Sequence, residues 1–236
     1  MKPHIASFLR MLFGIVMLPF CWALSLALFD SIVVAAGAAG GFTVELISLL
    51  AGMAAFSLCW MAVAHPVRAY ILGHELTHAL WGLLFGARPS RLRVGKDSGS
   101  VNLTKSNVFI TLAPYFFPFY TFLVIVAALI VSIFCRPLPF LPLWLFMVGF
   151  TWAFHVLFTF ETLTQRQPDI HLYGRIFSWV FIYAVNLTII LVWLSLTTSL
   201  KFTEMAGMIL ERSFGSYAGV GEGVCSIASY VLSLVR

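Results

Sequence analysis

The chain has 236 residues, of which 61% are hydrophobic and only 10% are charged, and its mean hydropathy is +0.99. Soluble domains are about half apolar and a quarter charged, so this composition excludes a sizeable soluble domain and indicates a polytopic membrane protein. The net charge of +5 includes no basic run, which argues against nucleic-acid binding.

Residues 1–66 are predicted to form two N-terminal transmembrane spans. An apolar run from Met11 to Phe29 follows a basic start, and it continues too far into aromatic residues to favour a cleaved signal peptide. A second run covers Phe42 to Ala64 and ends at His65-Pro66, because a proline disfavours helix in the residue before it.

The next apolar stretch, Val67 to Ala87, contains the motif His74-Glu75-Leu76-Thr77-His78. It is about 20 residues long, enough to cross a bilayer as a helix. His74 and His78 would share one face of that helix, so both imidazoles can reach one metal ion, with Glu75 one step round. Two histidines with a distant carboxylate and an open fourth position are typical of catalytic zinc. The alternative is a pair of helix histidines capped by neighbours, with Glu75 in an ion pair.

Residues 88–106 are the most polar stretch and predict a short β-hairpin. Two apolar pairs alternate with polar residues on either side of a glycine-bearing turn, a pattern typical of a hairpin. The residues that define it are Leu92, Val94, Gly95, Gly99, Val101 and Leu103. Two interpretations stay open: a solvated loop with some strand character, or an edge that holds an extended substrate by backbone pairing.

Two further spans are predicted from Val108 to Phe134 and from Leu143 to Phe160. Pro114 and Pro118 should kink the first of them and free backbone carbonyls. The second carries His155, which a neighbouring side chain normally satisfies in an apolar helix, although a place near the metal stays open.

The polar insertion from Glu161 to His171 supplies the candidates for the third metal ligand. Pro168 can start a helix and leave Asp169 in its first turn, where a carboxylate is well placed to reach a metal on a neighbouring helix. Asp169 is the first choice, and its alternative role is to complement the helix dipole. His171 is the second choice as ligand, and Glu161 is a third possibility. Gln167 and His171 could also donate to a developing oxyanion, with His155 as a further supporting residue.

A last span is predicted over residues 173–200, so residues 67–200 form the metalloprotease-like core, and 201–236 form a polar or interfacial tail. The fold class predicted is an all-α bundle of about six transmembrane helices with a short β-hairpin beside the metal site. The loop lysines and arginines cluster in the hairpin, which places that loop and the active-site side in the cytoplasm; they are Arg88, Arg91, Arg93, Lys96 and Lys105.

The motif helix, the glycine-bearing polar hairpin and the later Asp169 together resemble the site-2-protease family of intramembrane zinc metalloproteases, in particular its compact bacterial members. The resemblance covers roughly residues 67–190. It implies a multi-pass protein of the bacterial inner membrane that binds one Zn²⁺ per chain through His74, His78 and Asp169, with Glu75 as general base. It also implies that the substrate is a transmembrane protein, cleaved within or next to its membrane span.

Around the third ligand the family shows Asn-x-x-Pro followed by Leu-Asp-Gly, whereas this chain has Gln165-x-x-Pro168-Asp169-Ile170. A catalytically inactive relative, or a non-enzymatic metal-binding scaffold or transporter, therefore stays open. A transporter would be expected to contain an internal repeat with paired broken helices, and the sequence has none. Two histidines and a carboxylate also suit iron(II), although a glutamate next to the first histidine favours hydrolysis by zinc.

Overall fold

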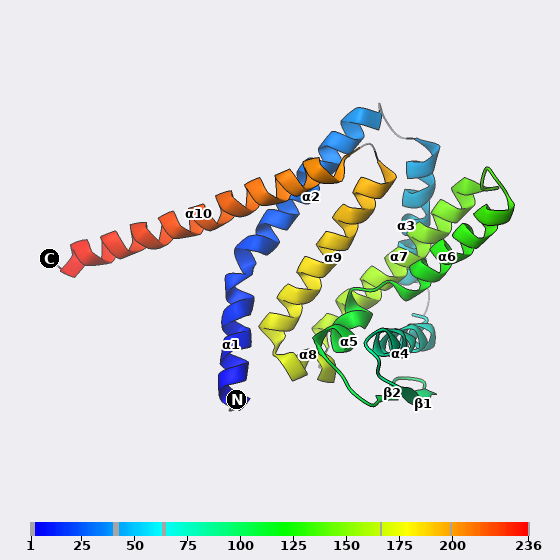
Figure 1. The fold of residues 1–236 in the computed structure, drawn as a ribbon, viewed down its shortest axis with the longest axis horizontal. Helices are drawn as coiled ribbons and strands as arrows, with labels where there is room; N and C mark the ends of the chain where they lie inside the picture. Colours follow the sequence, from blue (N-terminus) through cyan, green and yellow to red (C-terminus); the bar gives the residue numbers. More distant parts are fainter. Residues whose placement is uncertain (1–2, 40–42, 63–64, 166, 199, 236) are drawn as a thin grey trace. The chain divides into compact units, whose positions relative to one another are not determined.

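The computed structural model describes residues 3–39, 43–62, 65–165, 167–198 and 200–235, so the ends of the predicted span 42–64 lie outside the described residues. The described chain is mostly helical, with one small antiparallel sheet (Figure 1). Its elements are α1 (Pro3–Val16), α2 (Leu18–Ala39), α3 (Val44–Ala62), α4 (Val67–Leu84), β1 (Pro89–Val94), β2 (Gly99–Leu103), α5 (Val108–Leu112), the 3-10 helix η1 (Ala113–Tyr115), α6 (Phe119–Phe134), α7 (Leu141–Thr164), α8 (Pro168–Tyr173), α9 (Arg175–Thr197) and α10 (Phe202–Val235).

Four helical segments of the described chain are long and apolar enough to cross a membrane. They are 5–37, 44–62, 141–164 and 175–196, and the bent pair of 108–115 and 119–134 makes a fifth if it counts as one span. This inventory is consistent with an all-α membrane protein, with four to five candidate spans where the sequence predicted about six. The predicted span over the metal motif is not among these segments. Helix α4 is too polar, because it carries Arg68, His74, Glu75 and His78 within 18 residues.

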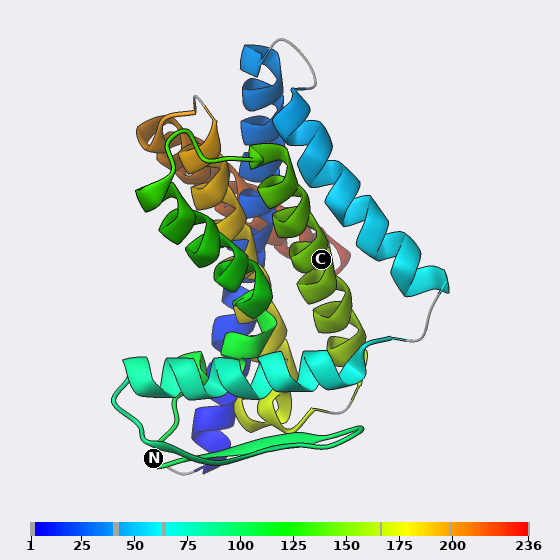
Figure 2. The same cartoon turned by 90° about the vertical axis from the view of Figure 1, so that its right-hand side faces the viewer.

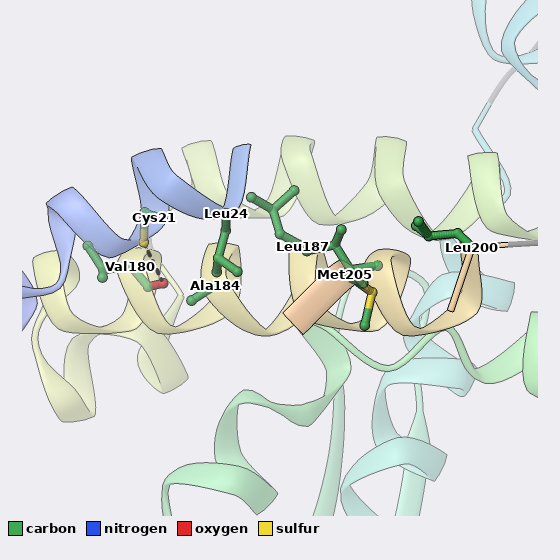
Figure 3. Packing of buried hydrophobic residues seen from close by; sticks show 8 residues of the cluster. Cys21, Leu24, Val180, Ala184, Leu187, Leu200 and Met205 are labelled. Atoms are coloured by element: carbon green, nitrogen blue, oxygen red, sulfur yellow. Dashed lines mark hydrogen bonds between the residues drawn. The ribbon is translucent and has the colours of Figure 1, made fainter. Parts of the chain in front are cut away.

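The chain divides into two compact units, residues 1–41 with 173–236, and residues 42–172. In the first unit, α2 packs against α9 and α10, and α1 packs against α9. Its core joins Cys21 and Leu24 of α2 to a face of α9 that includes Leu187 and Leu191, with Met205 from α10 (Figure 3). The predicted tail is one 34-residue helix, which continues outward beyond its contact with α2 (Figure 1).

The second unit is built on the close pair of α3 and α7. A Cβ on Gly52 of α3 would overlap the carbonyl of Phe146, and one on Gly149 of α7 would overlap the carbonyl of Leu49. Small residues at these crossings let the two backbones approach, as in many membrane helix pairs. Below the crossing, aromatic rings around Phe56 fill the interface.

The kink predicted at Pro114 and Pro118 is confirmed and is sharp, because the two halves of the segment meet at 83°. A proline cannot donate a backbone hydrogen bond, so the helix breaks into α5 and η1 before α6 begins at Phe119. The break places η1 against α4.

Helix α4 lies crosswise to α6 and α7, with the hairpin on its opposite side (Figure 2). The predicted hairpin is confirmed: β1 and β2 are antiparallel, and Val94 pairs with Gly99 at the turn. The register shifts between Ser90 and Arg93, where Arg91 has a positive φ of 51°. Thus α4 is held between the β-hairpin and the broken segment that contains η1.

Candidate metal centre

Helix α4 presents two histidines on one face, as their spacing predicts. The Nε2 atoms of His74 and His78 lie 3.1 Å apart, and the two side chains are only 11% and 12% exposed. The rings are nearly perpendicular, so both nitrogens converge on one point instead of stacking.

Asp169 completes a triangle with these two histidines. It lies in the first turn of α8, directly after Pro168, and its Oδ2 is 3.4 Å from each Nε2 atom. In a tetrahedral site the distance between two ligand atoms is about 1.63 times the metal–ligand distance, so bonds of about 2.05 Å give about 3.3 Å. The three edges of 3.1, 3.4 and 3.4 Å fit that geometry, and this group could hold a metal ion.

Each imidazole is oriented through its other nitrogen. The Nδ1 atom of His78 lies 2.8 Å from the carbonyl oxygen of Ile110, which can only accept, so Nδ1–H donates and Nε2 keeps its lone pair. The carbonyl of Ile110 is available because the residue four positions on is Pro114, which has no N–H to bond it. His74 Nδ1 lies 3.4 Å from the hydroxyl of Tyr70, one turn earlier on α4.

The Asp169 carboxylate is supported from η1. The hydroxyl of Tyr115, a fully buried side chain, donates to Asp169 Oδ2 at 3.2 Å. A hydroxyl that donates to a carboxylate stabilises its ionised form, which is the form that binds a metal.

Glu75 lies on a neighbouring face of α4, between the helix and β2. Its side chain is buried, and a Cβ on Gly99 of β2 would lie 2.8 Å from Glu75 Cγ and 2.9 Å from Oε1. The predicted base thus sits at the junction of the metal helix and the hairpin.

Both strands of the hairpin pack on α4, and β2 is the more buried of the two. Leu103 is half-buried, and its side chain would meet a Cβ placed on Gly82, so this glycine lets the strand approach the helix. On β1, Leu92 and Val94 are exposed. Because the described sheet has two strands, β1 also has one edge that pairs with no other strand, beside the metal helix.

The other candidate residues do not belong to this triangle. Glu161 is 3.7 Å from Nδ1 of His65, and His171 is exposed at the surface of α8. Gln167 is half-buried two residues before Asp169. His155 lines a small cavity that also includes His74. Within the described chain, the residues whose atoms converge with metal-ligand spacing are His74, His78 and Asp169.

Sequence reasoning did not identify the residues that orient the ligands. Tyr115 and Tyr70 carry no motif, and a backbone carbonyl has no side-chain signature. Pro114 was the one available signal, because a proline marks the carbonyl four residues earlier as free to bond elsewhere. No model of a known protein family matches the chain, and no curated protein or solved structure gives a match.

Proposed function

We propose that the protein is an intramembrane zinc metalloprotease of the site-2-protease type, which hydrolyses a peptide bond within or next to a transmembrane segment of a membrane-protein substrate. The observation that supports this most is the ligand triangle of His74, His78 and Asp169, with Glu75 directly after the first histidine. Two histidines and a carboxylate leave a tetrahedral ion one open position, which is the arrangement of a catalytic zinc.

Each residue of the site has a defined role in this proposal. A zinc ion bound here supplies Lewis-acid chemistry: it makes water acidic near neutral pH and polarises a carbonyl oxygen. His74, His78 and Asp169 hold it, while Ile110 and Tyr115 fix the orientation of two of these ligands. Glu75 takes the proton of the attacking water and returns it to the amine nitrogen as the C–N bond breaks.

The hairpin is the proposed substrate dock. A helical peptide bond is shielded by its own hydrogen bonds, so a substrate span must be unwound before hydrolysis. The free strand edge next to α4 can pair with the unwound segment as an added strand. The basic residues Arg88, Arg93 and Lys96 of the same hairpin favour a cytoplasmic position in a bacterial inner membrane.

One observation favours a second candidate, a non-enzymatic metal-binding scaffold. The Glu75 side chain is buried against Gly99 of β2, which shields its carboxylate from water. A scaffold would use His74, His78 and Asp169 and would have no need of a free Glu75.

The two candidates are separated by comparing wild type with Glu75→Gln in detergent. Both should contain about one zinc per chain by elemental analysis. A panel of synthetic single-span peptides is incubated with each in ¹⁸O-water, and mass spectrometry identifies fragments with ¹⁸O in a new carboxyl terminus. We expect such fragments with wild type and a loss of about 10²–10⁴-fold in rate with Glu75→Gln. Equal cleavage by the variant, or metal binding with no cleavage, would overturn the protease proposal.

A further inference from the structure

One short segment supports two of the three candidate metal ligands. Helix α5 and the 3-10 helix η1 together cover residues 108–115, and both contact α4. The segment presents the carbonyl of Ile110 to His78 near its start and the hydroxyl of Tyr115 to Asp169 at its end. The position of this segment therefore affects ligands that come from two different helices, α4 and α8.

Helix α5 is too short to hold its shape by itself. It has five residues, Val108–Leu112, and the first four N–H groups of a helix have no partner inside it. Helices shorter than about 12–15 residues are marginal without tertiary contacts, so α5 depends on its cap and on its packing. Because Ile110 and Thr111 are buried, contacts from the surrounding chain hold the backbone that faces His78.

Asn107 makes the contacts that fix the backbone on both sides of Ile110. Its side-chain oxygen accepts a hydrogen bond from the N–H of Ile110 at 2.9 Å, and its carbonyl oxygen accepts one from the N–H of Thr111 at 2.9 Å. The second N–H belongs to the same peptide unit as the Ile110 carbonyl, which lies 2.8 Å from Nδ1 of His78. Asn107 is thus joined to a candidate metal ligand through a single peptide unit.

The start of α3 has the same two contacts but leads to no ligand. The side chain of Thr43 accepts a hydrogen bond from the N–H of Leu46 at 3.3 Å, and its carbonyl accepts one from the N–H of Ile47 at 2.9 Å. Helix α3 is 19 residues long and supplies none of the three candidate ligands. The cap at Asn107 differs because the turn that it holds contacts His78.

We propose that Asn107 is a positioning residue of the metal centre. By capping α5 it holds the Ile110 carbonyl at the place where it orients His78, and so it directs the lone pair of Nε2 toward the metal. Partners that orient a metal-binding histidine contribute about 10–100-fold to metal affinity. Asn107 acts one bond further out, so we expect the lower end of that range. The inference rests on the metal centre of the proposed function, and it does not depend on hydrolysis.

The test separates an effect on the metal from an effect on stability. Glycine at a cap position destabilises a helix much less than alanine does, so Asn107→Gly removes the side-chain acceptor with little loss of stability. Cobalt(II) is bound in place of zinc to the full-length protein in detergent, because its visible absorption depends on the geometry of its ligands. Competition with a chelator measures the affinity, and melting is followed in metal-free protein.

The variants assign the effect to the side chain of one residue. Asn107→Gly should bind cobalt about tenfold less tightly, with shifted absorption bands at saturation, and should melt within a few degrees of wild type. Asn107→Ser should restore both affinity and spectrum, since a serine hydroxyl can accept the same hydrogen bond. Thr43→Gly is the matched control, because it deletes the equivalent bond at the start of α3. It should keep the affinity and spectrum of wild type.

Three outcomes would contradict the proposal at different levels. Wild-type affinity and spectrum in Asn107→Gly would overturn the role of Asn107 and leave the metal centre intact. Equal losses of affinity in Asn107→Gly and Thr43→Gly would also overturn it, since the effect would then be one of helix stability alone. A wild type that binds no cobalt would overturn the metal centre of the proposed function, and the positioning role with it.

Discussion

Two aspartates of the chain, one in each compact unit, pair in different ways. Asp30 of α2, in the first unit, meets Arg212 of α10 in a fork: Nε donates to Oδ2 at 2.7 Å and Nη2 donates to Oδ1 at 3.0 Å. Asp169, in the second unit, has one oxygen, Oδ2, surrounded by two histidines at 3.4 Å and by Tyr115 at 3.2 Å.

The distances separate a structural carboxylate from a candidate metal ligand. The contacts of Asp30 have ideal hydrogen-bond length, and both of its oxygens are satisfied by one guanidinium. The contacts between Asp169 and the histidines are longer than good N–H···O bonds, yet they match the edges of a tetrahedral metal site. The two aspartates therefore differ in how their oxygens are used, and the pairing of Asp30 carries no metal chemistry.

The largest effect on zinc affinity is expected when the charge of Asp169 is removed. Asp169→Asn should lower zinc affinity by more than about a hundredfold, beyond the loss usual for a supporting hydrogen bond, because it removes one of three ligands. Competition with a chelator measures the change. Asp30→Asn is the control and should bind zinc like wild type. Full zinc affinity in Asp169→Asn would transfer the third ligand to another residue.

A second variant removes the Tyr115 hydroxyl that supports Asp169. Tyr115→Phe keeps the buried ring and deletes the hydrogen bond to Oδ2, so zinc affinity should fall about tenfold while saturating zinc still fills the site. Tyr120→Phe is a matched control, since its hydroxyl bonds the backbone of Ala69 and contacts no ligand. Equal effects of the two variants would mean that the change reflects general packing.

A third variant tests the junction of Glu75 with the hairpin. In Gly99→Ala, the new Cβ would press on Ile71 and Glu75, so β2 must move away from α4 at a cost of about 1–3 kcal/mol. Gly207→Ala, in α10, meets no heavy atom within 4 Å and should stabilise its helix by about 0.5–1 kcal/mol. Denaturation in detergent measures both. A neutral Gly99→Ala would show that the hairpin is not packed against Glu75.

The sequence predicted the parts of the site that depend on local spacing. The i, i+4 histidines, the glycine turn of the hairpin, the break at Pro114 and the place of Asp169 in the first turn of a helix each follow from neighbouring residues. The approach of Asp169 to His74 followed from chemistry, because few carboxylates were available near the ends of the core spans.

What spacing could not supply are contacts between segments far apart in the chain. The hydroxyl of Tyr115 reaches Asp169 across 54 positions, and Arg212 reaches Asp30 across 182. Neither residue type signals its partner, because tyrosine and arginine are common at helix surfaces. Hydropathy also overestimated α4, where an apolar average over Val67 to Ala87 hid a helix rich in ionisable groups that lies crosswise to α6 and α7.

The smallest expected effect belongs to the pair of Asp30 and Arg212. Since Arg212 is largely exposed, Asp30→Asn and Arg212→Met should each lower the melting temperature in detergent by only a few degrees. The double variant should melt close to the single variants, because either change alone already breaks the fork. Zinc affinity should stay constant in all three. A loss of zinc on breaking this pair would contradict the division into one structural and one ligand aspartate, since it would make Asp30 a determinant of the metal centre.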